Sequence, residues 1–315
     1  MRGFTKRQQV RFVSDDAECA AWHYAGDNGA CVVMAAGFGV TKEPGTDRFA
    51  ARFQEAGFSV LAFDHRGFGD SGGGPRQVVR MREQLADWNA AIAHAATLPG
   101  VNPDRIAAWG FSLAGGHIIR VAADHPSLAA AVAQTPTVDG VATTLSAGRY
   151  QRPTAALRLL GRAVRDAVGG RVGRPPVLVP LAGEPGTVSA LTTPDGKQGP
   201  RALDPDGRYP EWQMAVAARS TLILGGYRPV RQASRVRCPL LVVAGDSDRS
   251  APPKAAIRTA ERAPRGELVR LKGGHYAPFL DEHEKVVSAE LEFLRRHLLG
   301  EDAQAEATAA EPGMV

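Results

Sequence analysis

The sequence has few cysteines, few aromatic residues and no long apolar run among its 315 residues. Its three cysteines, Cys19, Cys31 and Cys238, are widely spaced and odd in number, which indicates reduced thiols and offers no metal-binding motif. No apolar run approaches the length of a membrane-spanning helix, and no apolar segment follows the basic N-terminal residues as it would in a signal peptide. We therefore expect a cytoplasmic protein with no membrane partner.

Composition and charge argue against a further class of partner. Aromatic residues make up 6% of the chain and the net charge is +5, and no nucleic-acid recognition motif accompanies that charge. We therefore expect no nucleic-acid partner. The hydrophobic content of 44% and the charged content of 23% are those of an ordinary globular protein, and the length fits one large α/β domain with an insertion or two modest domains.

Apolar runs alternate with helical patterns along most of the chain, which predicts an α/β fold with a mostly parallel, doubly wound sheet. An early β-hairpin is predicted from the alternating residues 9–13 and 19–24. The later predicted strands are 30–36, 59–64, 106–109, 128–134, 239–244 and 267–271, and the predicted helices are 47–56, 78–98, 116–124, 254–263 and 283–299. Because ligands bind beyond the carboxyl ends of parallel strands, the loops there should converge on one site.

The alternation breaks in the middle of the chain, where proline, glycine and arginine become frequent. Two helical patterns, 154–168 and 210–224, flank an irregular stretch there. We interpret this region as a helical lid inserted into the core. The predicted parts are a first core segment at 1–136, the lid at 137–237, a second core segment at 238–299 and a disordered tail at 300–315.

Ser112 lies where a predicted strand meets a predicted helix. The run is Gly110-Phe-Ser112-Leu-Ala114-Gly115, with small residues two positions before and two positions after the serine. A nucleophile elbow needs this arrangement, because the strained turn that exposes the hydroxyl leaves no room for bulky neighbours. Taken alone, the run equally fits a connection in which Ser112 caps the helix.

Partners for such a serine follow the last two predicted strands. Asp248 lies three residues beyond the strand-ending Gly245 and is the preferred acid, with Asp246 as the reserve. His275 lies in a Gly-Gly-His loop and suits a general base, because imidazole titrates near neutral pH. It would take the Ser112 proton and return it to the leaving group, while the carboxylate fixes its tautomer.

Acyl transfer also needs hydrogen-bond donors for the oxyanion that develops on the substrate. One candidate is the backbone N–H of Leu113, which follows the nucleophile. The second is the backbone N–H of Phe38, in the loop after the predicted strand 30–36.

Together, these motifs resemble the α/β-hydrolase superfamily across nearly the whole chain. They are Ala36-Gly-Phe-Gly39, Asp64-His-Arg-Gly-Phe-Gly-Asp-Ser-Gly72, Gly110-Phe-Ser-Leu-Ala-Gly115, Gly245-Asp-Ser-Asp248 and Gly274-His275. The resemblance implies an α/β-hydrolase fold and a Ser112–His275–Asp248 triad, although Ala36 stands where many relatives have histidine. The lid segment 179–195 resembles the polyketide transferase and thioesterase-like branch, related to dipeptidyl-peptidase-like hydrolases. In that branch an acyl-enzyme passes its acyl group to water or to an alcohol.

We therefore predict a serine hydrolase that cleaves a small-molecule carboxylic ester or thioester through an acyl-Ser112 intermediate. Such chemistry needs no metal or organic cofactor. The alternatives are an acyltransferase or thioesterase of polyketide-type secondary metabolism, a peptidase, and a non-catalytic ligand-binding protein on the same fold. The sequence leaves the acyl chain, the leaving group and the oligomeric state open.

The predicted lid holds all of the excess positive charge. Residues 137–237 contain fifteen Arg or Lys against seven Asp or Glu, whereas the rest of the chain contains 23 against 26. Three arginines share one helical face, opposite four aliphatic residues; they are Arg158, Arg162 and Arg165, opposite Leu157, Leu160, Val164 and Val168. This pattern fits a solvated face, or a surface for an anionic partner such as a CoA ester or an acidic acyl carrier protein.

Overall fold

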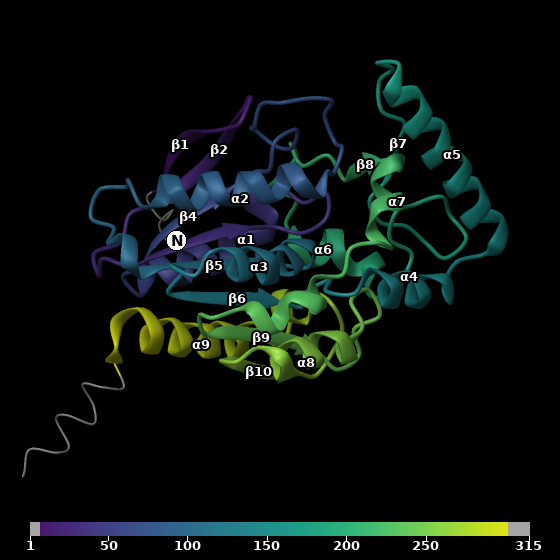
Figure 1. Ribbon diagram of the computed structural model, residues 1–315. Coiled ribbons are helices and arrows are strands. Elements are labelled where there is room, and N and C mark those ends of the chain that lie inside the picture. Colours follow the sequence, from purple (N-terminus) through teal and green to yellow (C-terminus); the bar gives the residue numbers. More distant parts are fainter. Residues whose placement is uncertain (1–6, 302–315) are drawn as a thin grey trace, which may run out of the picture.

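The computed structural model describes residues 7–301, whose main feature is an eight-stranded sheet with the order β1-β2-β4-β3-β5-β6-β9-β10 (Figure 1). The first two strands form an antiparallel hairpin, β2 is antiparallel to β4, and the other neighbours are parallel. The strands are β1 (Arg7–Ser14), β2 (Ala17–Tyr24), β3 (Cys31–Ala35), β4 (Ser59–Phe63), β5 (Ile106–Phe111), β6 (Ala130–Gln134), β9 (Leu240–Gly245) and β10 (Gly266–Leu271). This is the α/β-hydrolase architecture that the sequence predicted.

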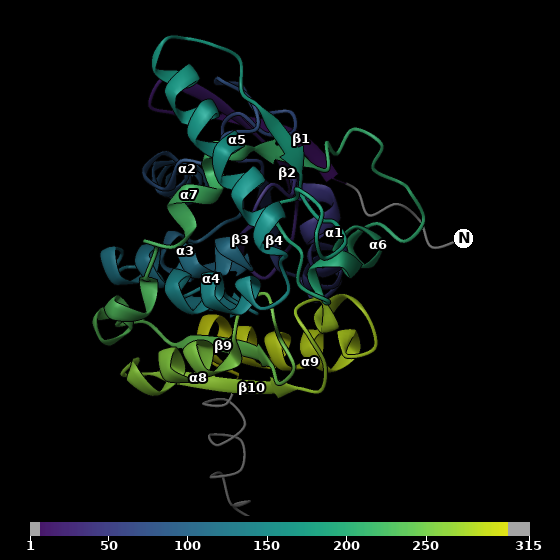
Figure 2. The same cartoon turned by 90° about the vertical axis from the view of Figure 1, so that its right-hand side faces the viewer.

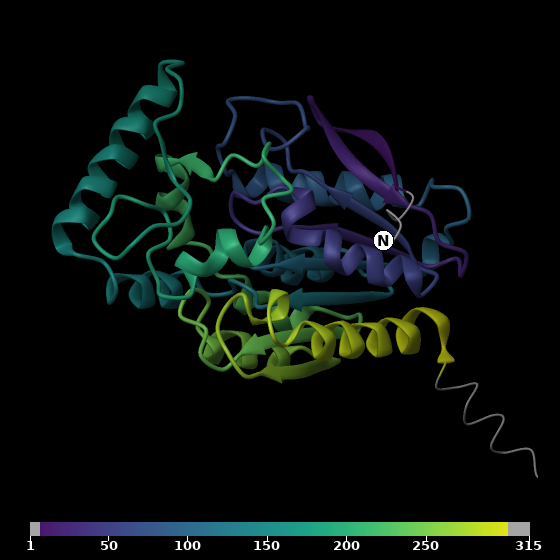
Figure 3. The ribbon, with the colours of Figure 1, turned by 180° about the vertical axis from the view of Figure 1, so that it is seen from behind.

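Helices cover both faces of the sheet. Helices α1 and α9 lie on one face (Figure 3, purple and yellow), and α2, α3 and α8 lie on the other. Their bounds are α1 (Lys42–Glu55), α2 (Met81–Ala95), α3 (Leu113–Asp124), α8 (Pro253–Arg262) and α9 (His283–Leu294). The central strands β3, β5 and β6 are buried along their whole length, as expected for parallel strands with helices on both sides. Two hydrophobic cores result, one on each face.

Local differences from the predicted elements have identifiable causes. Helix α1 starts five residues earlier than predicted, at Lys42, because Pro44 lies in its first turn, where a missing N–H costs nothing. Gly45 lets this turn approach the end of β3, since a Cβ there would lie 2.2 Å from the Cβ of Ala36. The last helix, predicted as 283–299, keeps α-helical geometry to Leu294 and continues with a wider turn, Arg295–Leu299. The predicted tail lies outside the described residues, except for its first two.

Most of residues 137–237, the segment predicted as a lid and called the lid below, extends from one end of the sheet, toward which the arrow of β6 points (Figure 1). Its last part packs in the core beside α3 and α8, through Val230, Ala233 and Val236. The helices of the lid are α4 (Gly140–Gly148), α5 (Pro153–Arg171), α6 (Gly199–Leu203) and α7 (Thr221–Leu224), and β7 (Leu178–Pro180) pairs with β8 (Ala215–Ala217). The helix predicted at 210–224 is wrong: only its last turn is α-helical. The backbone N–H of Ala217 donates instead to the carbonyl of Gln77 in the core, a tertiary contact that local pattern does not reveal.

The long helix α5 lies along the outer surface of this region (Figure 2). Ala155, Ala163 and Asp166 form its buried face. The aliphatic residues opposite the arginines point outward and are about half exposed; they are Leu157 (68%), Leu160 (50%), Val164 (49%) and Val168 (56%). None of the helices in 7–301 is long and apolar enough to cross a membrane.

Candidate active site

Ser112 lies in the sharp turn between β5 and α3. Its backbone has φ 57° and ψ −116°, a strained conformation for a residue with a side chain. The turn is tight because a Cβ at Gly110 would lie 2.5 Å from the carbonyl carbon of Ala114. Its backbone is held by a hydrogen bond from the Ser112 N–H to the Gln134 carbonyl, 2.9 Å long. The sequence Gly110–Ala114 therefore folds as an elbow that presents the serine hydroxyl at the end of the sheet.

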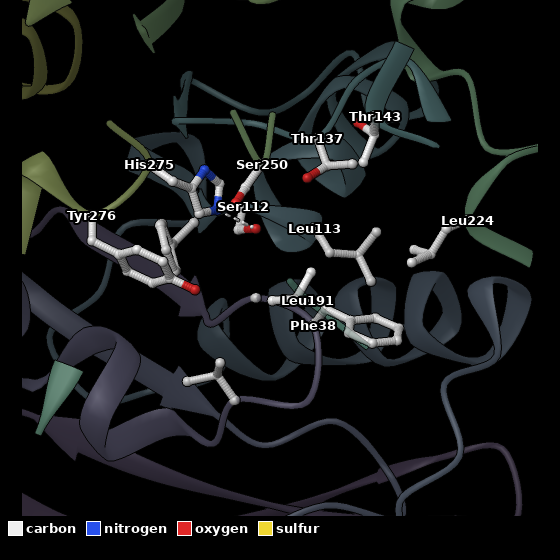
Figure 4. A pocket seen from close by; sticks show the side chains of 13 residues that line it. Phe38, Ser112, Leu113, Thr137, Thr143, Leu191, Leu224, Ser250, His275 and Tyr276 are labelled. Atoms are coloured by element: carbon white, nitrogen blue, oxygen red, sulfur yellow. Dashed lines mark hydrogen bonds between the residues drawn. The ribbon is translucent and has the colours of Figure 1, made fainter. Parts of the chain in front are cut away.

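A hydrogen-bonded chain runs from Ser112 through His275 to Asp248, and Figure 4 shows its first link, between Ser112 and His275. The Oγ of Ser112 lies 2.8 Å from the Nε2 of His275, and the Nδ1 of His275 lies 2.8 Å from Oδ2 of Asp248. The three residues come from the loops after β5, β10 and β9, at the carboxyl ends of these parallel strands. The reserve acid, Asp246, points elsewhere: it pairs with Arg270 at 2.8 Å, and its side chain is 40% exposed.

Burial and charge act in opposite directions on His275. Burial lowers its pKa, because the charged imidazolium loses water. The charge of Asp248 and its hydrogen bond, together with the charge of Asp195, raise it by more. The net effect is a raised pKa, so His275 is a stronger base than an ordinary histidine and binds a proton more tightly once it has taken it.

Two backbone N–H groups lie beside the serine without a protein acceptor. Neither the N–H of Phe38 nor that of Leu113 donates a hydrogen bond to another residue in 7–301. Gly37 brings their two loops together, since a Cβ there would lie 2.8 Å from the Cβ of Ser112. From the lid side, the indole Nε1 of Trp212 donates to the Gly39 carbonyl at 3.0 Å and holds the loop that contains Phe38.

The cavity beside Ser112 is small and largely apolar. Its free volume is about 30 Å³, enough for a water molecule but not for an acyl chain. Leu191, Leu224 and Thr143 close it from the region 137–237 (Figure 4). Ser112 itself is partly exposed at this cavity. No group of three or more His, Cys, Asp or Glu among the described residues could hold a metal ion.

Asp195 is the polar residue at this site that the sequence motifs do not single out. It lies in the lid, and its carboxylate accepts hydrogen bonds from the backbone of Arg249, Ser250 and His275. Its partners in the core are 54 to 80 positions away in the sequence, so no local spacing signals the contact. The only available hint is that Asp195 ends the segment 179–195, which carries the narrower family resemblance.

A sequence profile of the family described as serine aminopeptidase, S33, matches residues 26–281. The chain belongs to this family of hydrolases. A solved structure, DcsB in complex with its substrate analogue, shares the fold with a TM-score of 0.78 and 24% identity, and the match covers 93% of this chain and all of that one. The resemblance to the α/β-hydrolases is thereby confirmed.

Curated relatives agree with the narrower resemblance. The quorum-quenching protein AidA of Acinetobacter baumannii (strain MDR-ZJ06) is 38% identical over 292 residues, or 91% of this chain and 94% of that protein. The polyketide transferase grgF of a Penicillium species is 29% identical over 297 residues, or 93% of this chain and 97% of that protein. Both matches extend through the lid as well as the core, and the match to the polyketide transferase agrees with the narrower resemblance.

Proposed function

We propose that this hydrolase cleaves a carboxylic ester or thioester through an acyl-Ser112 intermediate. The observation that carries the proposal is the continuous hydrogen-bonded chain from the Ser112 hydroxyl through His275 to Asp248. The Oγ of Ser112 attacks the carbonyl carbon while the Nε2 of His275 takes its proton, and Asp248 stabilises the imidazolium that forms. The N–H groups of Phe38 and Leu113 are the proposed donors to the oxyanion.

The tetrahedral intermediate collapses by breaking the bond to the leaving group. The alcohol or thiol leaves with the proton from His275, and the acyl group stays on Ser112. Water then attacks the acyl carbon, His275 takes a proton from it, and the acid is released as Ser112 recovers its proton. If an alcohol replaces this water, the same steps transfer the acyl group and form a new ester.

Transfer is the second candidate, because the cavity beside Ser112 is small and mostly apolar. Leu191 and Leu224 cover it, so a bound alcohol of the right shape would exclude bulk water from the acyl-enzyme. The polyketide transferase relative supports transfer. The name of the quorum-quenching relative gives no comparable support for transfer.

Intact-mass analysis with a fluorophosphonate probe tests the activated serine. We expect one adduct on the wild type and none on Ser112→Ala or His275→Ala, because labelling requires both the nucleophile and its base. Thermal unfolding of each variant serves as the control for folding. Absence of an adduct on folded wild-type protein, together with no turnover of ester, thioester and lactone panels, would contradict the proposal and favour a ligand-binding role.

The excess positive charge of the lid supports an anionic form of the substrate, such as a CoA ester or an acyl group on an acidic carrier protein. Between residues 140 and 183 there are seven arginines, and Asp166 is the sole acidic residue. Asp166 is buried and pairs with Arg219, whereas Arg158, Arg162 and Arg165 are exposed and have no carboxylate partner among the described residues. This part of the surface therefore attracts anions.

A further inference from the structure

The carboxylate of Asp195 joins the lid to both loops that carry the partners of Ser112. We infer that Asp195 is a positioning residue for the proposed reaction. It fixes the loops of Asp248 and His275 and supplies a second negative charge near the imidazole. The inference rests on the proposed function, and it names a residue that the Ser112–His275–Asp248 arrangement does not include.

The hydrogen bonds of Asp195 divide between its two oxygens. Oδ2 accepts from the backbone N–H groups of Arg249 at 2.7 Å, Ser250 at 3.3 Å and His275 at 3.3 Å. Oδ1 accepts from the Ser250 hydroxyl and from the N–H of Gly196, both at 2.9 Å. Arg249 and Ser250 directly follow Asp248 in the sequence, so one carboxylate fixes the acid loop and the histidine loop together.

The surroundings of Asp195 are built for an ionised carboxylate. The residue is only 8% exposed, yet each of the five groups around it donates a hydrogen bond, which offsets the loss of water. Burial alone would raise its pKa, but the charge of His275 and these hydrogen bonds lower it below the ordinary value. Asp195 is therefore negatively charged whenever His275 takes up a proton near neutral pH.

Gly274 makes the close approach of the lid carboxylate possible. A Cβ at Gly274 would lie 3.1 Å from the Cβ of Asp195 and 3.3 Å from its Oδ2, which is tighter than ordinary contact. Behind the carboxylate, the Thr193 hydroxyl lies 2.6 Å from that of Ser250 and adds a second link between lid and acid loop. The residue before His275 is therefore a glycine because the lid carboxylate lies against it.

Two carboxylates therefore lie near His275: Asp248 hydrogen-bonds to its imidazole, and Asp195 accepts from its backbone N–H. The titratable groups packed at this junction are His275 and Tyr276 from the loop after β10, Asp248 from the loop after β9, and Asp195 from the lid. Tyr276 is neutral near pH 7, because burial raises the pKa of its hydroxyl. Asp248 and Asp195 both favour the imidazolium, and Asp195 does so only while the lid is in place.

Replacement of Asp195 by asparagine tests this role through the pH dependence of kcat/KM. The base must be neutral to act, so activity falls as the pH drops through the pKa of His275. Loss of a negative charge lowers that pKa, so we expect the acidic limb of the Asp195→Asn profile to move to lower pH by about one unit. We also expect kcat to fall about tenfold or more, because a small misplacement of a reacting group has effects of this size.

Two matched variants separate positioning from a general structural defect. Asp195→Glu keeps the charge but changes its reach, so it should keep the acidic limb of the wild type and lower kcat. If Asp195→Asn does not fold, this variant provides the test. Asp246→Asn removes a carboxylate from the loop of Asp248 that pairs with Arg270 instead of His275, and it should leave both the acidic limb and kcat unchanged. An Asp195→Asn limb that coincides with the wild-type limb, or an Asp195→Glu limb at lower pH, would overturn the inference.

An NMR titration of histidine-labelled protein gives the same answer without turnover. The ring signals of His275 are assigned by their loss in His275→Ala, and their midpoint should lie at lower pH in Asp195→Asn than in the wild type. If the wild type lacks both hydrolysis and probe labelling, the proposed function fails, while this titration still decides the role of Asp195.

Discussion

Gly37 lies directly against Ser112, the proposed nucleophile, in the loop that would supply one of the oxyanion donors. Its position leaves no space for a methyl group, since a Cβ would lie 2.8 Å from the Cβ of Ser112 and 3.3 Å from its Oγ. Ser112 cannot move away, because its turn is already strained and its N–H and carbonyl are both hydrogen-bonded. The absence of a side chain at Gly37 therefore sets the distance between the two loops.

Gly37→Ala should lower kcat/KM on an ester substrate by about 100-fold, because displacement of a reacting group by about 1 Å has effects of this size. The matched control is Gly148→Ala at the end of α4, where an added Cβ meets nothing within 4 Å. Steady-state kinetics and melting temperatures of both variants provide the measurement. Equal kcat/KM for the two would show that the loop adapts to the methyl group and that the contact does not constrain the serine.

At the scale of single residues, the sequence predicted those candidate site residues that are marked by their neighbours in the chain. Ser112 and His275 lie in glycine-rich loops at predicted strand ends, and the Oγ of Ser112 lies 2.8 Å from the Nε2 of His275. Asp195 could not be found in this way, because its contacts depend on how the lid folds back onto loops 54 to 80 residues away. The same holds for Trp212, whose indole reaches the carbonyl of Gly39.

Helix α1 begins at a buried cation that links it to the strand β4. The Nζ of Lys42 lies 2.7 Å from Asp64, 2.8 Å from Asp70 and 2.9 Å from Glu43, and only 1% of its side chain is exposed. Asp64 itself is fully buried and also accepts the backbone N–H groups of Lys42 and Asp70. This cluster fixes the start of α1, and with it the end of the Phe38 loop.

Lys42→Met should destabilise the fold by about 3–5 kcal/mol, because it leaves the buried carboxylate of Asp64 without its counter-ion. Urea unfolding gives the free energy, and Lys254→Met, at an exposed position on α8, is the control, expected to stay within about 0.5 kcal/mol. The double variant Lys42→Met/Asp64→Asn should regain part of the loss, since it removes the unpaired charge. A single variant as stable as the wild type would contradict a structural role for this cluster.

Elements defined by burial were predictable, and elements defined by long-range pairing were not. The continuous apolar runs of β3, β5 and β6 predict strands buried on both faces, and the small residues around Ser112 predict the strained elbow. The pattern at 210–224 failed because β8 exists only through its pairing with β7 and through the Gln77 carbonyl. Periodicity reports which face of an element is apolar, not which partner the fold brings to it.

In the whole molecule, charge is separated between lid and core. The lid carries eight more basic than acidic residues, and the rest of the chain carries three more acidic than basic ones. On α5, an exposed arginine face and an exposed aliphatic face lie side by side, and neither is covered by another described element. This surface supports the proposed anionic form of the substrate, a CoA ester or an acyl group on an acidic carrier protein.

The salt dependence of kcat/KM tests this separation of charge. For an acyl-CoA thioester, we expect kcat/KM to fall about tenfold or more between low and high ionic strength, because screening removes the attraction of the lid for the anion. A neutral thioester with the same acyl group should show a flat profile. Changing Arg158, Arg162 and Arg165 to glutamine should flatten the CoA profile as well.

The matched control changes three other arginines to glutamine: Arg258, Arg262 and Arg265. These arginines have the same spacing and exposure, on and just after α8, and their replacement should leave the CoA profile steep. If wild type and both triple variants gave the same CoA profile, the arginines of α5 would be an ordinary solvated face, and selection of the substrate would rest on the apolar cavity beside Ser112 alone.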